Sequence, residues 1–213
     1  VSITVYHKSN YIMRHPFINK MVFLDDNNQL KEIKSTEDEE YIKNRLKNAI
    51  NKMKDYKLFI PFINKPYLPL FFKLTYMFAS DKDFAEFLKT MWNYMEYPNC
   101  SRNISKNEWL QYFEKADKNL LMSKKELKIY NNLPNEVEIY RGVDIHDNVY
   151  ALSWTLDYEK AKYFSTTFNN KGKVYKITIK KKYIFAYFNA GDESEVIVDY
   201  TKIKDNDLVV CCV

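Results

Sequence analysis

The chain has 213 residues, which is long enough for one sizeable domain or for a compact domain with an attached lobe. Hydrophobic residues make up 46% of it and charged residues 29%, an ordinary globular balance that excludes wholesale disorder. The formal net charge of +5 is mildly basic and favours an anionic ligand or partner. It is too small to indicate a nucleic-acid-binding protein.

Cysteine and histidine usage narrows the chemistry further. Cys100, Cys211 and Cys212 provide neither a metal-ligand spacing nor an even disulfide framework, which favours a reduced, intracellular protein. The three histidines share no spacing typical of a metal site or a catalytic triad. We therefore expect no metal cofactor.

The sequence contains no segment typical of a membrane protein. Residues 58–79 are rich in apolar side chains, but Lys65, Lys73 and three prolines interrupt them, so no run approaches the roughly 20 residues that a span requires. The first residues lack the basic segment, apolar core and small-residue cleavage site of a signal peptide. We expect neither membrane association nor secretion by that route.

The first 35 residues predict a β extension. Two short apolar segments, 21–24 and 30–33, flank the sequence Asp-Asp-Asn-Asn, and this arrangement is typical of a hairpin. The chain has no internal repeat and no low-complexity segment, so the elements that follow are expected to form one ordinary globular arrangement.

Residues 36–131 predict a helical lobe. Thr36 and Glu39 have the spacing of a capping box, which predicts the start of the first helix. A second helix is expected over residues 81–95, and two more begin where a serine precedes a glutamate by three positions, at Ser105/Glu108 and Ser123/Glu126. The apolar stripes of the first two helices indicate core-facing surfaces rather than a cofactor site. They consist of Ile42, Leu46, Ile50 and Met53, and of Phe84, Phe87, Leu88, Met91 and Met95.

After residue 131 the pattern changes to the alternation of strands and predicts a β core over residues 132–213. Val137, Ile139 and Arg141 are expected to share one face of a strand, and residues 174–179 to alternate cleanly in another. The sequence therefore predicts an α+β fold in which a helical lobe precedes a β core.

One short helix is expected between these strands, over residues 157–164, with Ala161 and Phe164 facing inward. Glycine is scarce, with only three in the chain, and Gly142 and Gly191 lie beside the motifs described next. Since glycine is used where the backbone turns tightly or lets another group approach closely, this placement supports a site there.

Three motifs in the last third of the chain carry the chemistry: Tyr140-Arg141-Gly142, Ser153-Trp154-Thr155 and Glu193-Ser194-Glu195-Val196. An arginine suits a pyrophosphate because its planar fork makes bidentate contacts that lysine cannot copy. Two hydroxyls spaced two apart on a strand point to one face and can hold a ribose and a neighbouring carboxylate. A carboxylate in a water-poor cleft stabilises the sugar cation that develops when nicotinamide leaves ribose. Together the motifs indicate an NAD site.

The order of these motifs resembles the arginine-serine-glutamate class of mono-ADP-ribosyltransferases, which includes clostridial-type toxins and phage-injected transferases. The resemblance covers roughly residues 133–199 by motif, and the helices upstream agree only in general architecture. It implies a split β-sandwich around an NAD cleft, with residues 1–213 forming a single transferase domain. It also implies an enzyme that acts inside a cell, whether made there or delivered into a host cell.

The resemblance also assigns roles to individual residues. Arg141 matches the pyrophosphate-binding arginine, Ser153 the structural serine and Glu195 the catalytic glutamate, while Glu193 matches the residue that orients an arginine acceptor. The middle motif of the family is commonly Ser-Thr-Ser, and Ser-Trp-Thr keeps both hydroxyls but requires different packing beneath the site. Phe164 and Phe168 border the stretch expected to cover the nicotinamide. The expected NAD-binding set is Tyr140, Arg141, Gly142, Ser153, Thr155, Phe164, Phe168 and Glu195.

Each motif alone also has an ordinary structural explanation, such as an ion-paired strand arginine or a solvated acidic edge, and it is their order that favours the functional interpretation. The leading hypothesis is the transfer of ADP-ribose from NAD to an arginine of a target protein. Two alternatives stay open: an NAD glycohydrolase, and a binding module that has lost turnover. Glu193 favours transfer because hydrolysis needs no acceptor-orienting carboxylate, and the intact catalytic set argues against the silent module.

Overall fold

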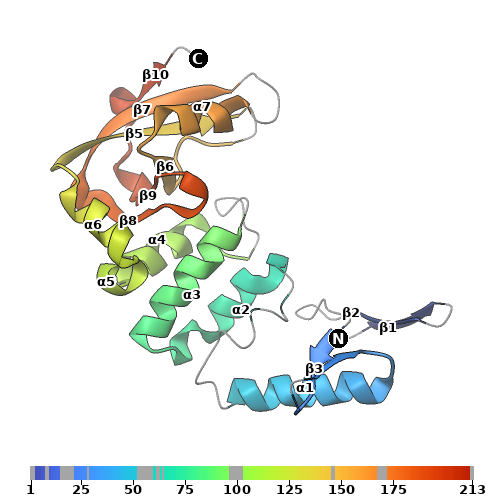
Figure 1. Ribbon diagram of the computed structural model, residues 1–213. Coiled ribbons are helices and arrows are strands. Elements are labelled where there is room, and N and C mark those ends of the chain that lie inside the picture. Colours follow the sequence, from blue (N-terminus) through green and yellow to red (C-terminus); the bar gives the residue numbers. More distant parts are fainter. Residues whose placement is uncertain are drawn as a thin grey trace. The chain divides into compact units, whose positions relative to one another are not determined.

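The computed structural model describes most of the chain, in the residue ranges 3–7, 10–14, 22–27, 29–51, 60, 63, 65–95, 103–144, 147–166 and 172–211. The chain divides into two compact units, Val1–Met95 and Glu96–Val213 (Figure 1). The expected helical lobe of residues 36–131 therefore runs across the boundary between the two units.

The first unit combines hairpins with helices. Its elements are β1 (Ile3–His7), β2 (Asn10–Arg14), β3 (Val22–Leu24), β4 (Leu30–Glu32), α1 (Thr36–Asn51), α2 (Leu68–Thr75) and α3 (Asp81–Tyr94). β3 and β4 pair antiparallel, which confirms the expected hairpin. Asp25 closes its turn, because its Oδ1 accepts hydrogen bonds from the backbone amides of Asn27 at 2.9 Å and Gln29 at 3.0 Å.

The start of α1 differs from the expectation by one residue. Ser35 Oγ accepts a hydrogen bond from the Asp38 amide at 3.1 Å, and Asp38 Oδ2 accepts one from the Ser35 amide at 3.1 Å. The expected capping box of Thr36 and Glu39 is therefore wrong. The same reciprocal spacing occurs one residue earlier, and Asp38 also accepts from the Lys34 amide at 2.9 Å.

The expected apolar stripe of α3 is confirmed at four buried positions, Phe84, Phe87, Leu88 and Met91, while Met95 follows the helix and is half-buried. In α1 Ile42 is buried as expected, and the side chains of Leu46 and Ile50, like the whole of Met53, lie outside the described part. Within the described segments, no helix has both the length and the apolar composition needed to cross a membrane.

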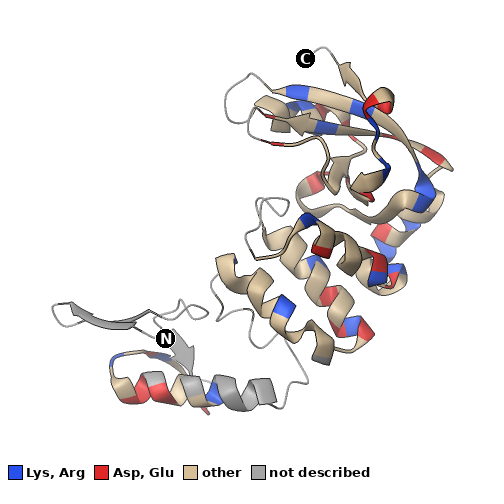
Figure 2. Ribbon diagram, turned by 180° about the vertical axis from the view of Figure 1, so that it is seen from behind, with Lys and Arg blue, Asp and Glu red and all other residues tan. Residues whose placement is uncertain are grey.

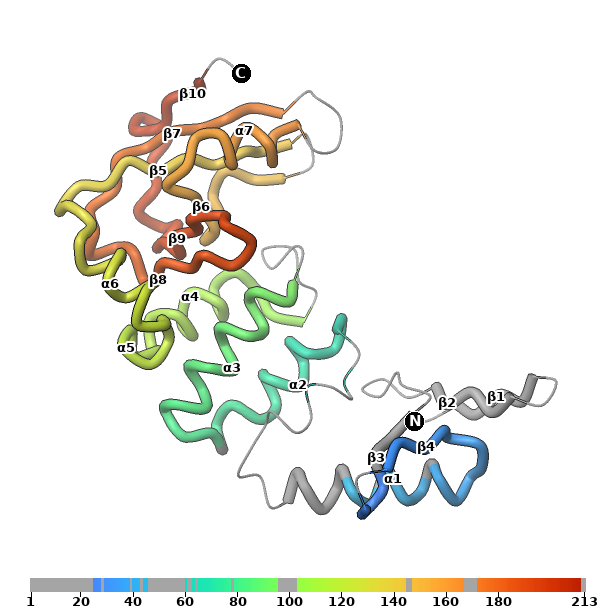
Figure 3. Tube along the Cα trace, in the orientation of Figure 1, coloured from blue at the N-terminus to red at the C-terminus, as the bar shows by residue number. Residues whose placement is uncertain are grey.

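The second unit is built on a six-stranded antiparallel sheet in the order β10-β7-β5-β6-β9-β8, traced in Figure 3. Its elements are α4 (Lys106–Lys115), α5 (Lys118–Leu121), α6 (Lys124–Asn132), β5 (Glu136–Val143), β6 (Ser153–Thr155), α7 (Tyr158–Thr166), β7 (Lys173–Lys180), β8 (Ile184–Phe188), β9 (Glu195–Val198) and β10 (Val209–Cys211). Three helices precede the strands, α7 lies between β6 and β7, and all the strand pairs are antiparallel, so the unit is α+β.

Helices cover the sheet at two places. α4, α5 and α6 pack against β8, and α7 packs against β5 and β7. The capping boxes expected for α4 and α6 are both present, at Ser105/Glu108 and Ser123/Glu126. Phe113 of α4 and Phe188 of β8 are fully buried with ring centroids 6.3 Å apart, which places part of the core between these elements.

The burial pattern of the paired strands β5 and β7 shows which faces are covered. In β5, Val137, Ile139 and Arg141 are all buried, as expected for one core-facing side. In β7 the expected clean alternation is wrong, because Val174 is buried as well as Ile177, three positions along. Val174 lies opposite Gly142 on the face that α7 covers, so both faces of the sheet are buried at that end.

Candidate active site

Ser153 joins two of the residues that the sequence singles out. Its Oγ donates a hydrogen bond of 2.5 Å to Oε1 of Glu195, and its backbone oxygen accepts one of 2.6 Å from Nη1 of Arg141. β6 and β9 are paired so that Thr155 lies opposite Glu195, which makes Ser153 the diagonal neighbour of Glu195 on the same face. Three side chains from three strands are thus connected through one residue.

The Arg141 side chain is buried and held by several partners. Only 8% of the residue is exposed. Besides its bond to Ser153, Nε donates to the backbone oxygen of Asn148 at 3.1 Å and Nη2 contacts Oδ2 of Asp147 at 2.5 Å. The sequence predicts a pyrophosphate at this guanidinium, and in the structure an aspartate carboxylate meets it. The position therefore already accommodates an anion.

The separation of β5 from β6 explains how Arg141 reaches Ser153. The two strands share one paired position, where Tyr140 lies opposite Thr155, whereas β5 pairs with β7 along its whole length. Successive residues of a strand point to opposite faces, so Arg141 leaves β5 on the face opposite to Tyr140. Beyond that pair, the Arg141 guanidinium bonds to the Ser153 carbonyl, and Tyr140–Thr155 is the one paired position of β5 and β6 among the described residues.

Thr155 serves the backbone around the site. It is buried, with 5% exposure. Its Oγ1 donates to the backbone oxygen of Glu193 at 2.7 Å and accepts from the Asp157 amide at 3.0 Å, at the start of α7. The expected sharing of a face by Ser153 and Thr155 agrees with the strand register, but these bonds engage the Thr155 hydroxyl with the loop before β9.

Glu193 lies in the loop between β8 and β9 and is half-buried. Burial raises the pKa of its carboxyl group, and the positive charge of Lys160 on α7 acts in the opposite direction. The backbone around it is unusual, because φ is +63° at Gly191, +57° at Asp192 and +48° at Ser194. Left-handed conformations are uncommon at residues other than glycine. Those that do occur are concentrated at functional sites.

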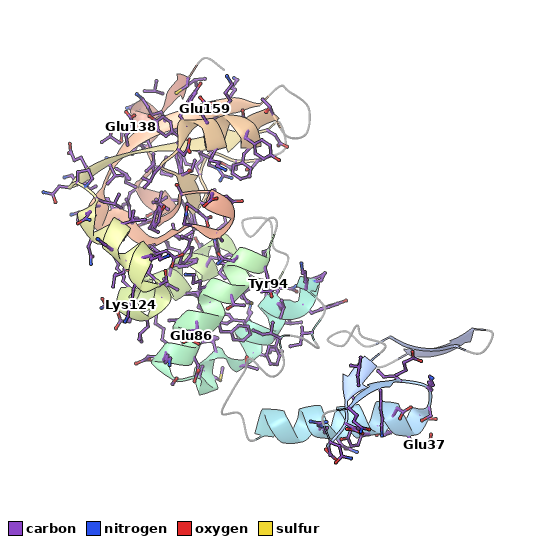
Figure 4. All side chains as sticks on the ribbon, viewed as in Figure 1. Glu37, Glu86, Tyr94, Lys124, Glu138 and Glu159 are labelled. Atoms are coloured by element: carbon purple, nitrogen blue, oxygen red, sulfur yellow. The ribbon has the colours of Figure 1, made fainter. Side chains whose placement is uncertain are left out.

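Tyr140 and Gly142 contact protein groups on the α7 side of β5. The Tyr140 hydroxyl donates to Glu138, and this bond, together with burial, raises the pKa of Tyr140 to about 12. Its ring lies edge-on to Tyr158 of α7, with centroids 5.6 Å apart. A Cβ at position 142 would lie 2.0 Å from the backbone oxygen of Ala161, so Gly142 lets α7 approach the sheet. Figure 4 labels Glu138 on β5 and Glu159 on α7, the two elements concerned.

Of the two aromatic residues expected at the nicotinamide, Phe164 and Phe168, the structure describes only Phe164. Ala161 is buried as expected, but Phe164 is 40% exposed, so the expectation that it faces inward is wrong. The residues of α7 that are buried are Ala161 and Ser165, one turn apart, and Phe164 lies beside that stripe next to exposed Tyr163, at a centroid distance of 5.6 Å. Phe168 lies outside the described residues.

Three residues around the site have no counterpart in the sequence motifs: Asp147, Lys160 and Asn189. Asp147 and Asn189 lie in loops and Lys160 lies on α7. No sequence spacing predicts that they contact the site. Their contacts depend on how distant segments pack, which is why motif reading misses them. Charge does not mark the site either, because both signs occur across the helices and strands of this unit (Figure 2).

No cluster of three or more histidine, cysteine, aspartate or glutamate residues suited to a metal ion occurs in the described ranges. Compared with known proteins, the chain matches no family model, no curated protein and no solved structure. The functional argument consequently depends on the geometry of the site itself.

Proposed function

We propose that this protein is a mono-ADP-ribosyltransferase that transfers ADP-ribose from NAD to an arginine of a target protein and releases nicotinamide. In this proposal the six-stranded sheet, whose strands β5 and β6 share one paired position, is the NAD-binding core of a split β-sandwich. One observation carries it: Ser153 connects the carboxylate of Glu195, at 2.5 Å, with the guanidinium of Arg141, at 2.6 Å. A carboxylate and a guanidinium linked by one serine match the requirements of a ribosyl transfer from a dinucleotide.

The reaction breaks the bond between the ribose C1′ and the nicotinamide nitrogen, and the bonding electron pair leaves with neutral nicotinamide. A guanidinium nitrogen of the acceptor then forms the new bond to C1′ and releases a proton. The barrier lies mainly in the cation that develops on the ribose, and the Glu195 carboxylate is placed to stabilise it. The short bond from Ser153 fixes the orientation of that carboxylate.

In the proposed NAD complex each of the remaining residues has a role. The buried guanidinium of Arg141 binds the pyrophosphate at the position where Asp147 now supplies a carboxylate. Phe164 offers an exposed ring on α7 for stacking on nicotinamide, and Phe168 follows it in sequence. Tyr140, Gly142 and Thr155 support the site through their contacts with Glu138, α7 and the Glu193 loop.

Transfer to arginine is favoured over hydrolysis by the position of Glu193. It lies two residues before Glu195, in a loop that Thr155 ties to β6, so both carboxylates belong to one local structure. A glycohydrolase needs no second carboxylate for an acceptor. A silent binding module is disfavoured, because Arg141, Ser153 and Glu195 are all intact and loss of turnover is expected to change one of them first.

The test is incubation of the protein with NAD labelled in the adenylate moiety, together with a cell extract and, separately, with agmatine as a small guanidinium acceptor. Labelled protein bands and labelled agmatine support arginine transfer. Free ADP-ribose without labelled acceptor supports the glycohydrolase. Unchanged NAD in both incubations contradicts the proposed enzymatic function.

A further inference from the structure

The loop between β8 and β9 adopts a conformation that its own sequence does not favour. Within four residues, Gly191, Asp192 and Ser194 all have positive φ. Only the first is a glycine, and a left-handed conformation is uncommon for other residues, serine in particular. Such a backbone persists only where surrounding contacts hold it. Glu193, the carboxylate assigned to the acceptor, lies between the two non-glycine residues concerned.

Asn189 makes two of the contacts that hold this loop, in addition to the bond from Thr155 to the Glu193 backbone oxygen. Its Oδ1 accepts a hydrogen bond from the Ser194 amide at 3.1 Å, and its Nδ2 donates to Oδ1 of Asp192 at 3.2 Å. One side chain therefore binds the residue before Glu193 and the residue after it. Tyr187 also donates to the Asn189 oxygen, at 3.3 Å.

The backbone of Asn189 is anchored to α6. The Asn189 amide donates to Oε1 of Glu126 at 3.3 Å, while Oε2 of the same glutamate accepts from the Ser123 amide at 2.7 Å. Glu126 is 8% exposed and belongs to the capping box of α6. Asn189 is thus fixed at its backbone by a buried carboxylate, and its side chain is directed at the loop.

Glu195 is held by a different set of contacts. It belongs to β9, lies opposite Thr155 of β6 and Phe188 of β8, and receives the bond from Ser153. Loss of the Asn189 side chain removes contacts on both sides of Glu193 but leaves these strand pairings in place.

We infer that Asn189 is a positioning residue for the arginine acceptor: it fixes the loop that presents Glu193, and so controls transfer without controlling cleavage of NAD. This inference rests on the proposed function and adds to it a residue that divides the two activities. The class of acceptor it serves is a guanidinium, since Glu193 offers a carboxylate that can accept two parallel hydrogen bonds.

The experiment measures agmatine labelling and nicotinamide release in parallel for the full chain and for Asn189→Ala. The variant loses two hydrogen bonds to the loop and the one from Tyr187. Labelling is therefore expected to fall about tenfold or more, with KM for agmatine raised and nicotinamide release without acceptor within about twofold of wild type. Asn206→Ala is the matched control, because Asn206 is exposed in the same unit. Equal losses of labelling and release in Asn189→Ala overturn the inference.

A second pair of variants tests the contact itself. Asn189→Asp keeps an oxygen for the Ser194 amide but sets a second carboxylate against Asp192, so labelling is expected to fall. Adding Asp192→Asn restores a donor and an acceptor in exchanged positions, and asparagine tolerates a positive φ. Recovery of labelling in the double variant supports the inference, and a further loss contradicts it.

The outcomes also separate this inference from the proposed function. If the wild-type protein neither releases nicotinamide nor labels agmatine, the proposed function fails and the inference fails with it. If the wild type does both and Asn189→Ala labels agmatine as well as wild type does, only the inference fails. Nicotinamide release by the variant also shows that it has folded, so a loss of labelling alone is not a loss of structure.

Discussion

Glu195 is the residue on which the chemistry depends most directly. It receives a 2.5 Å hydrogen bond from Ser153, so its charge is oriented before any substrate arrives. Glu195→Gln keeps the shape and removes the charge, and nicotinamide release is expected to fall on the order of a hundredfold or more. Calorimetry should show NAD binding retained. Glu159→Gln removes the same charge from the exposed side of α7 and is the control (Figure 4). Near-wild-type turnover in Glu195→Gln would exclude this carboxylate as the catalytic group.

Asp147 occupies the place that the proposed function gives to a pyrophosphate. Its carboxylate contacts Arg141 at 2.5 Å, where the arginine side chain is 9% exposed and the aspartate 33%. NAD must therefore displace this carboxylate. Asp147→Asn removes the competing charge, so NAD no longer has to break one partly buried ionic contact. The Kd for NAD is therefore expected to fall about tenfold. Asp207→Asn, at an exposed position, controls for net charge. An unchanged or higher Kd for Asp147→Asn would mean that the pyrophosphate binds elsewhere.

The raised pKa of Glu193 predicts how transfer depends on pH. Burial makes the folded protein favour the protonated form, so Glu193 retains its proton above the usual glutamate pKa of about 4.3. Transfer is expected to fall relative to NAD hydrolysis as the pH drops through this raised value. The folded state loses stability as pH rises through the same value, so Glu193→Gln should raise the Tm near pH 7 and leave it unchanged below pH 4, by the linkage of proton binding to folding. A transfer-to-hydrolysis ratio that does not change with pH in the wild type would contradict this role.

At the level of elements, the contact of α7 with β5 is close enough for a single substitution to test it. A Cβ at position 142 would lie 2.0 Å from the Ala161 oxygen and 2.6 Å from the Ser165 nitrogen. Both atoms are backbone, so α7 must shift as a whole. Gly142→Ala is expected to lower the free energy of unfolding by about 1–3 kcal/mol or more, measured by denaturant titration. Thr178→Ala, on the exposed side of β7, is expected to change it by less than about 1 kcal/mol. Equal unfolding midpoints for Gly142→Ala and wild type would contradict the close packing.

Elements with local signals could be predicted well from the sequence. The capping boxes of α4 and α6 need only residues three apart, and both are present. The start of α1 shows the limit of such signals, because Ser35/Asp38 and Thr36/Glu39 offer the same spacing and only the fold selects between them. The burial of Val174 could not be predicted, since it depends on a helix that packs over one end of the sheet.

The candidate site was predictable where strand geometry alone decides it. Ser153 and Thr155 lie two apart on one strand and so share a face, and the register that pairs Thr155 with Glu195 brings Glu195 to the same face, where it meets Ser153. Asp147 and Asn189 were not predictable, because loops bring them to Arg141 and to the Glu193 loop. The exposure of Phe164 was missed for a related reason: helical spacing places it near Ala161, but the packing of α7 decides how far the buried stripe extends.

At the scale of the whole molecule, the second unit contains every group that the proposed function requires. Arg141, Ser153, Glu193 and Glu195 all belong to Glu96–Val213, and so do α6 and its Glu126, which anchors the loop through Asn189. The unit also has its own core, in which fully buried side chains come from helices, from strands and from the residue before β6: Trp109, Phe113, Leu121, Ile139, Leu152, Trp154 and Phe188. A unit with its own core and its own complete site is expected to fold by itself.

The last prediction follows from this organisation. A fragment of residues 96–213 should unfold cooperatively and bind NAD with the same Kd as the full chain, within about threefold, because none of the groups assigned to NAD lies in Val1–Met95. Thermal unfolding followed by circular dichroism tests the first point, and calorimetry tests the second. The fragment carrying Glu195→Gln serves as the control, since it should bind NAD but release nicotinamide more slowly, by about a hundredfold or more. If the fragment folds cooperatively and fails to bind NAD that the full chain binds, then Val1–Met95 supplies part of the NAD site, and the assignment of that site to the second unit alone is wrong.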